Sequence, residues 1–100
     1  MVAQNSQPRR SALFSLGSLV ATPGALAALE RARQTPMTFL SRHVCGDWGT
    51  VCEDDKKLND QSVKNGTRIL SAYETSAGEK LWVITEADRN STTILLPDEY

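Results

Sequence analysis

The sequence predicts a domain of the α+β class, with two or three helices packed in a second layer on one face of an antiparallel meander of three or four strands. Two observations support this prediction. Signals that start helices occupy the first two-thirds of the chain, and the alternation of apolar and polar residues that is typical of strands begins after Gly66. Because helices and strands are segregated along the chain, we expect consecutive strands to pair with one another.

Three helices are expected. Thr22-Pro23 and Thr35-Pro36 each supply an N-cap hydroxyl followed by a proline at the first helical position, where no N–H is needed. They predict helices over about residues 23–33 and 36–44. A third helix is expected over about residues 53–65, because three acidic residues open it and a glycine follows it. This third helix has few apolar residues, so we expect it to lie on the surface.

Three strands should follow in sequence. Residues 68–74 and 80–86 flank a polar turn and predict a β-hairpin. Residues 92–96 predict the next strand, which ends at a proline that cannot donate to a ladder. The segment 13–21 is expected to add a fourth strand at one edge of the sheet, and strand 92–96 is expected at another edge.

Length and composition restrict the organisation and the class of protein. The 100 residues predict a flexible N-terminal arm over 1–11 and one domain over 12–100. No apolar run approaches the roughly 20 residues that a membrane span requires. Eleven basic and twelve acidic residues give a net charge of −1, which removes the usual electrostatic reason to predict nucleic-acid binding.

Cys45 and Cys52 are too few for the disulfide framework of a small secreted domain, and they favour a reducing, cytoplasmic setting. Whether the two cysteines pair is left open by their spacing. Arg9-Arg10 before an apolar stretch resembles a twin-arginine export signal, but Ser15 and Gly17 dilute that stretch and disfavour this alternative.

Two groups of polar residues are candidates for binding a partner. The first lies around a turn between glycines and contributes Arg42, His43, Asp47 and Trp48. The second lies in the last turn between strands and contributes Asp88 and Arg89. A charged turn can also simply keep a sheet soluble, and a histidine in the last turn of a helix is a common partner of the helix dipole. We predict these six residues as the contacts of a protein partner.

Three other chemistries depend on His43 and Asp47, on the two cysteines, and on a pair of arginines. His43 and Asp47, four positions apart, would suit a base and its orienting acid in a small hydrolase or metal-assisted enzyme. The spacing of the cysteines does not match the usual zinc sites, so neither a metal nor another cofactor is expected. Arg31 and Arg33 near a helix end are the residues on which nucleic-acid binding would depend.

Several segments carry a resemblance to a known group of proteins. They are Ala21-Thr22-Pro23-Gly24-Ala25-Leu26, Arg42-His43, Gly46-Asp47-Trp48-Gly49, and the stretches 66–73, 80–89 and 92–97. In these the chain resembles a family of short bacterial proteins encoded on plasmids and integrated elements, often labelled plasmid-related or type I restriction-associated. The family has no established activity, so no catalytic residue is implied. The resemblance implies a mobile-element setting, where small accessory proteins commonly bind and block host defence machinery.

The function expected from the sequence is therefore a non-enzymatic protein-binding accessory or regulatory protein of a mobile genetic element, with inhibition of restriction or CRISPR machinery as one form of it. Nucleic-acid binding and the small hydrolase or metal-assisted enzyme around His43 and Asp47 are the alternatives. An edge strand would also permit a homodimer.

Overall fold

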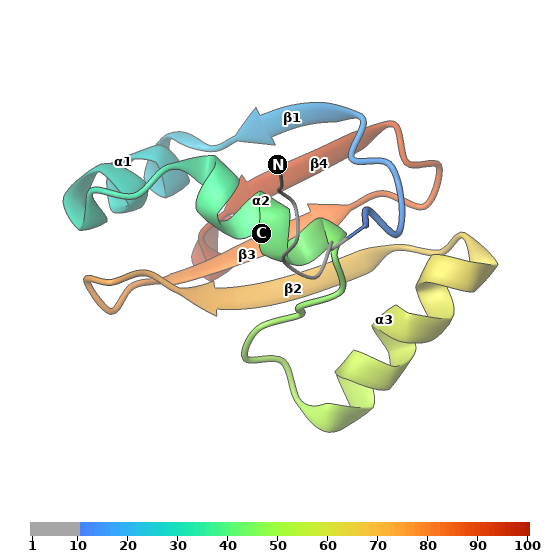
Figure 1. The fold of residues 1–100 in the computed structure, drawn as a ribbon. Helices are drawn as coiled ribbons and strands as arrows, with labels where there is room; N and C mark the ends of the chain where they lie inside the picture. Colours follow the sequence, from blue (N-terminus) through green and yellow to red (C-terminus); the bar gives the residue numbers. More distant parts are fainter. Residues whose placement is uncertain (1–10) are drawn as a thin grey trace, which may run out of the picture.

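The computed structural model describes residues 11–100, so the predicted arm lies outside the described residues except for Ser11. The elements follow one another as β1 (Ser18–Ala21), α1 (Pro23–Ala32), α2 (Pro36–Val44), α3 (Glu53–Asn65), β2 (Ile69–Glu74), β3 (Lys80–Thr85), β4 (Ser91–Leu95) and a short 3-10 helix, η2 (Pro97–Glu99). The α+β class is confirmed, and each predicted helix and strand is present (Figure 1). The ends differ little, except that the strand predicted in segment 13–21 covers only Ser18–Ala21.

The four strands form one sheet in the order β1-β4-β3-β2. Strands β2, β3 and β4 make the predicted antiparallel meander. The prediction of a purely antiparallel sheet is wrong, because β1 pairs with β4 in parallel, Ser18 opposite Ser91 and Ala21 opposite Ile94. Three helices separate β1 from the meander, and so long a connection lets the chain re-enter the sheet in the same direction. The predicted edge position of strand 92–96 is also wrong, since β4 lies inside the sheet and the edges are β1 and β2.

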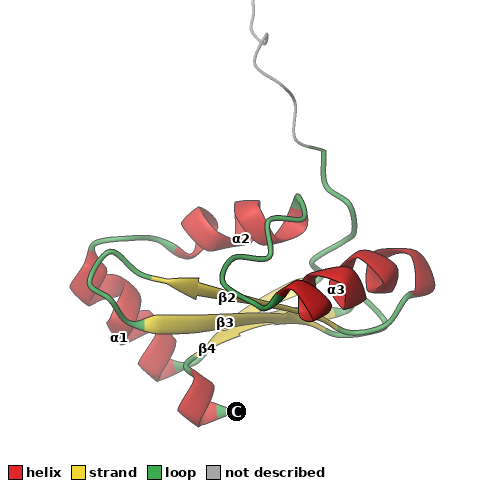
Figure 2. Cartoon of the chain, turned by 90° about the horizontal axis from the view of Figure 1, so that it is seen from below, coloured by secondary structure: helices red, strands yellow, loops and turns green. Residues whose placement is uncertain are grey.

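The three helices occupy different positions around the sheet. Helix α2 lies over one face, α1 crosses the end of the sheet, and α3 lies beside the β2 edge (Figures 1 and 2). The face under α2 carries the core. Its buried apolar residues come from α1, α2 and the strands: Ala25, Ala28, Leu29, Phe39, Leu40, Tyr73, Leu81, Val83 and Ile94. The expectation that α3 lies on the surface is confirmed, because its buried residues are the polar Asn59 and Ser62.

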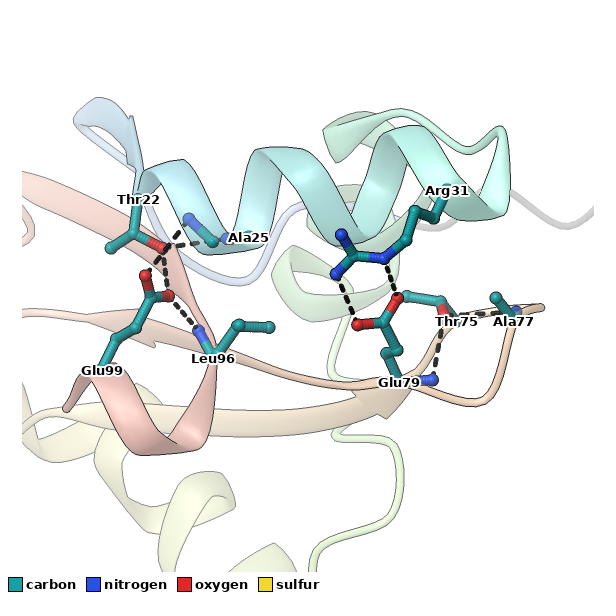
Figure 3. Close-up of polar contacts among 9 residues, drawn as sticks. Thr22, Ala25, Arg31, Thr75, Ala77, Glu79, Leu96 and Glu99 are labelled. Atoms are coloured by element: carbon teal, nitrogen blue, oxygen red, sulfur yellow. Dashed lines mark hydrogen bonds and ion pairs between the residues drawn. The ribbon is translucent and has the colours of Figure 1, made fainter.

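Helix α1 is fixed at both ends by side chains from distant parts of the chain (Figure 3). At its start, Thr22 Oγ1 accepts from the Ala25 N–H at 3.1 Å and donates to the Glu99 carboxylate at 2.5 Å. At its end, Arg31 forms a two-bond ion pair with Glu79, with N–O distances of 2.8 and 2.6 Å. The helix therefore connects the C-terminus to the β2–β3 turn and sets the position of β1, which leads into it.

The opposite face of the sheet has a smaller apolar layer. Ile84 and Leu95 are buried there, and Trp82 contacts the Tyr100 ring edge-on with 5.6 Å between centroids. The Arg68 guanidinium lies 5.5 Å from the same Tyr100 ring. The last residues of the chain therefore cover part of a face on which none of the three α-helices lies.

Candidate functional site

His43, a predicted contact of a partner, lies completely inside the fold with an exposed fraction of 0%. Its Nδ1 is 2.6 Å from Ser71 Oγ on β2, and its Nε2 is 2.9 Å from Thr85 Oγ1 on β3. Thr85 Oγ1 is in turn 2.8 Å from Thr92 Oγ1 on β4, and that hydroxyl donates to the Leu16 carbonyl at 2.7 Å. One chain of hydrogen bonds therefore joins α2, three strands and the segment before β1.

The carbonyl at one end of this chain sets the direction of every proton in it. Because the Leu16 carbonyl oxygen can only accept, the Thr92 hydroxyl donates its single proton to it and must accept a hydrogen bond from Thr85. Thr85 in turn accepts from His43, so the imidazole carries its proton on Nε2, and Nδ1 accepts from Ser71. Both ring nitrogens are thus engaged within the core, and the imidazole offers no free lone pair to a substrate.

Burial keeps this imidazole neutral. Desolvation, together with the positive charge of Arg89, lowers the pKa of His43 from its ordinary value of 6.5 to about 4. The rings of Phe14 and Trp48 surround it edge-on, with centroid distances of 5.2 and 5.9 Å. The charged form is disfavoured because these apolar neighbours replace water around the ring.

We expect the stability of the protein to fall on mild acidification. In the unfolded chain His43 binds a proton below pH 6.5, whereas in the folded protein it does so only near its lowered pKa of about 4. Between these two pH values protonation favours the unfolded chain, so the free energy of unfolding is highest above pH 6.5 and falls as the pH decreases toward 4. At about pH 5.5 the loss is roughly 1.5 kcal/mol. Urea unfolding at pH 7 and about pH 5.5 measures it.

The chain has a single histidine, so an NMR titration reads its pKa without any assignment problem. Hydrogen bonds from Arg31 and Thr22 lower the pKa values of the Glu79 and Glu99 carboxyl groups below their ordinary 4.5, so these two groups titrate below the range from pH 5.5 to 7. A His43 pKa near 6.5 in the folded protein, or a urea midpoint that stays constant over this range, would contradict the expectation.

Arg42 and Asp47 form an ion pair beside β2. Arg42 Nε donates to Asp47 Oδ2 at 2.7 Å, and the guanidinium lies 4.6 Å from the centre of the Tyr73 ring. The Tyr73 hydroxyl donates to the Asp47 backbone carbonyl at 2.6 Å. Both charged side chains are partly exposed, at 42% and 37%. Of the six predicted contacts, this pair is therefore placed so that a partner could reach it, although its own bonds already orient it.

Trp48 is buried at 4% exposure and connects three elements. Its indole N–H donates to the Asp60 carboxylate on α3 at 3.0 Å, and its ring stacks on Phe14 with centroids 6.2 Å apart. Its backbone carbonyl accepts from Ala72 on β2 at 3.2 Å. Trp48, predicted as a contact of a partner, therefore lies in the core, and a partner would have to open the fold to contact this ring.

Arg89 binds carbonyl groups of its own chain. Its guanidinium donates to the carbonyls of Ser62 and Thr67, both at 2.8 Å, and to that of Glu86 at 3.0 Å. Ser62 lies in the last turn of α3, where its carbonyl also accepts from the Gly66 N–H at 2.9 Å, and Thr67 follows the helix. The neighbouring Asp88 is exposed and accepts from the Asn90 N–H at 2.9 Å. Arg89 therefore attaches α3 to the β3–β4 turn, and Asp88 shapes that turn.

These positions bear on the alternative functions. His43 is enclosed and its nitrogens are engaged, so its geometry does not favour a hydrolase centred on this residue. Within residues 11–100, no three histidine, cysteine or acidic side chains gather as metal ligands would, and Cys45 and Cys52 are both thiols. Arg31 is committed to Glu79, which leaves it less suited to binding phosphate. Over the same range, no helix is long and apolar enough to cross a bilayer.

The two edges of the sheet differ in a way that bears on binding. At the β2 edge, the Asn59 side chain of α3 donates to the Leu70 carbonyl at 2.7 Å and accepts from the Leu70 N–H at 3.2 Å. Ala72 donates to the Trp48 carbonyl at 3.2 Å, and its own carbonyl accepts from the Thr50 N–H at 2.7 Å. The outward backbone groups of Leu70 and Ala72 are thereby satisfied, so this edge is closed to another strand.

The β1 edge has no such cover among the described residues. Ser18 and Thr22 donate inward to β4, to the carbonyls of Asn90 and Ile94 at 2.9 and 3.0 Å. Since inward and outward groups alternate along a strand, the N–H and C=O groups of Leu19 and Ala21 point away from the sheet. Neither a proline nor a charged residue, the usual protections of an exposed edge, occurs within β1.

An apolar groove runs beside this open edge. It has a volume of about 260 Å³ and lies between β1 and the start of α2. Its lining residues are all uncharged: Leu19, Val20, Ala21, Pro36, Met37, Leu40, Thr92 and Ile94. Leu19, Val20 and Met37 are exposed at 54%, 49% and 58%. A second hollow, lined in part by Leu26 and Glu30 of α1, adjoins it at Pro36. Open backbone groups and exposed apolar side chains thus coincide at β1.

Sequence reasoning predicted β1 as an edge strand but missed what distinguishes the two edges. The closing role of Asn59 has a weak signal in the sequence, because it is a polar residue in a helix with few apolar ones. The buried hydroxyls of Ser71 and Thr85 have a clearer signal, since they fall in step with the apolar residues on the core side of their strands. Comparison of the chain with protein-family models, with curated proteins and with solved structures finds no match.

Proposed function

We propose that this protein is a non-enzymatic binding module that takes an extended segment of a partner protein along β1. The observation that carries the proposal is the contrast between the two edges of the sheet. Four backbone groups at the β2 edge are satisfied by the chain itself, whereas those of Leu19 and Ala21 on β1 point outward. A strand added to such an edge gains main-chain hydrogen bonds, and adjacent pockets select its side chains.

The chemistry of the β1 side restricts what can bind there. A strand that runs beside β1 would place every second side chain over the groove between β1 and α2, against Met37 and Pro36. None of the lining residues is charged, so a charged side chain would lose water there without gaining a counterion. The expected partner segment is extended and uncharged, with apolar residues at alternate positions.

The mobile-element setting and the choice of restriction or CRISPR machinery as the partner rest on the resemblance described above. Purified restriction and CRISPR effector complexes are therefore the first probes. The predicted contacts Arg42, Asp47, Asp88 and Arg89 are an alternative set of contacts, and Arg42→Ala and Asp88→Ala in the same assay test it.

The proposal predicts a pattern of binding across four forms of the protein, immobilised at low concentration. Ala21→Pro removes an outward N–H while leaving the bonds of β1 to β4 in place, and Met37→Glu puts a charge in the groove. Leu58→Lys changes a residue on α3 that is as exposed as Met37, at 58%, and serves as the matched control. We expect wild type and Leu58→Lys to retain a probe, and both β1-side variants to lose at least about tenfold in affinity.

Two outcomes would overturn the proposal. One is that no purified probe is retained by the wild type. The other is that a retained probe binds all four forms equally, which would place its contacts elsewhere. Circular dichroism of each variant shows whether lost binding reflects the altered surface or an unfolded chain.

A further inference from the structure

We infer that in the free protein β1 is covered by β1 of a second copy, running antiparallel, so that two four-stranded sheets join into one continuous sheet. This inference rests on the proposed function, because it assigns a competing occupant to the same edge. It follows from the pattern of backbone groups along β1, from the side chains beside them, and from their lack of charge.

The outward groups of β1 are complementary to themselves. Leu19 and Ala21 are separated by Val20, whose backbone groups point inward to β4. If a two-fold axis passes beside Val20, Leu19 of each copy lies opposite Ala21 of the other. In an antiparallel pair, two such residues exchange both of their N–H to C=O bonds. Every outward group of Leu19 and Ala21 then gains a partner, with no group left over.

The side chains also fit this register. The side chains of Leu19 and Ala21 share one face of β1 with Thr92 and Ile94 of β4, the α2 side, and Val20, which also borders the groove, points to the other face. Ala21 carries only a methyl group, which leaves room for Leu19 of the second copy beside Met37. The two Val20 side chains meet on the opposite face, next to the axis. Three side chains that are about half exposed in one copy are covered together.

The absence of charge permits a second copy to approach and disfavours a charged segment. At a two-fold axis each residue approaches its own duplicate, so a charged side chain near the axis would repel itself. The strand Ser18–Ala21 has no charged residue, and neither does the lining of the groove beside it. An edge adapted only to a charged partner would carry the opposite charge, and this one carries none.

The dimer would regulate the site that the proposed function uses. Binding of a partner strand requires β1 to be free, so the two occupants exclude each other and the apparent affinity for the partner falls as the protein concentration rises. Pairing also covers the edge that is most exposed to uncontrolled strand addition.

Sedimentation equilibrium of the full chain, alone and over a concentration series into the high micromolar range, tests the inference. We expect the mass to rise from 11.0 kDa toward twice that value in the wild type and in Leu58→Lys. Ala21→Pro and Met37→Glu should remain monomeric over the same series. No partner is present, so the result does not depend on whether the proposed function holds.

Amide hydrogen exchange of the wild type gives a second readout that needs no variant. In the dimer the N–H groups of Leu19 and Ala21 should exchange at least about tenfold more slowly than in the dilute monomer. The N–H of Val20, which bonds to β4 in both states, should change little. A monomer at every concentration would overturn the inference, and so would a dimer in which Leu19 and Ala21 exchange freely.

Discussion

Replacing His43 by leucine is expected to lower the free energy of unfolding by roughly 3 to 5 kcal/mol, a large part of the stability of a small domain. Leucine fills a similar space but donates and accepts nothing. Ser71 then keeps a buried O–H donor without an acceptor, which costs about 1 to 3 kcal/mol, and Thr85 loses the bond from His43 while its own proton remains bonded to Thr92. Because these two residues lie on neighbouring strands under α2, the loss should also loosen the contact of that helix with the sheet.

A double variant distinguishes the lost hydrogen bond from a simple change of shape. Ser71→Ala removes the orphaned hydroxyl, and replacing both partners of a buried hydrogen bond by apolar groups is close to neutral. His43→Leu combined with Ser71→Ala should therefore recover about half of the lost stability in urea unfolding at pH 7. A double variant no more stable than His43→Leu alone would mean that packing of the imidazole, rather than its bond to Ser71, stabilises this region.

The same residue shows how far the sequence leads. Position 43 was predicted in the last turn of a helix, and the helix is there. The sequence predicts its side chain as a contact of a partner, because it belongs to the group of polar residues around a turn between glycines. Its burial depends on Ser71 and Thr85, which lie 28 and 42 positions away and become neighbours only when β2 and β3 pair beneath α2. Local patterns specify the elements, whereas this contact depends on the tertiary arrangement.

The pairing of the strands was predictable from the sequence for the meander but not for β1. Short connections correctly predicted that β2, β3 and β4 form a meander, because neighbouring strands with tight turns have little choice but to pair. No comparable rule applied to β1, which is followed by three helices before the next strand. Its parallel pairing with β4 was therefore missed, and with it the fact that β4 has a neighbour on each side.

The candidate binding surface also required the tertiary structure. The sequence predicts the residues of β1 as part of an edge strand, and it predicts Met37 as part of the helix over 36–44. Only the folded chain shows that the two lie beside one groove. The sequence predicts charged residues as the contacts of a partner. Two of them, Arg42 and Arg89, bind groups within the protein instead, the Asp47 carboxylate and the Ser62 carbonyl. In this fold much of the polar chemistry stabilises the molecule, and the uncommitted backbone groups lie on an apolar strand.

Gly49→Ala is expected to destabilise the protein by at least about 3 kcal/mol, because it prevents the closure of the β2 edge. Gly49 has a φ of +76°, and a Cβ at this position would overlap the carbonyl oxygen of Ala72. It also forms an isolated β-bridge with Ala72, between the two backbone bonds that Trp48 and Thr50 make to that residue. The overlap involves backbone atoms, so a change of side-chain rotamer cannot relieve it.

Gly78→Ala separates the overlap from the cost of the backbone conformation. Gly78 lies in the β2–β3 turn at a φ of +85°, where an added Cβ meets nothing within 4 Å. Its substitution should therefore show only the penalty of a left-handed alanine, about 1 to 2 kcal/mol. The excess loss in Gly49→Ala, measured by urea unfolding, then reports the close approach to Ala72. Faster amide exchange at Ala72 should accompany it, since Trp48 and Thr50 would be displaced from the strand. Equal losses in the two variants would show that the segment around Gly49 can move away from β2 at little cost, and the closure of this edge would then depend on the bonds of Asn59 to Leu70.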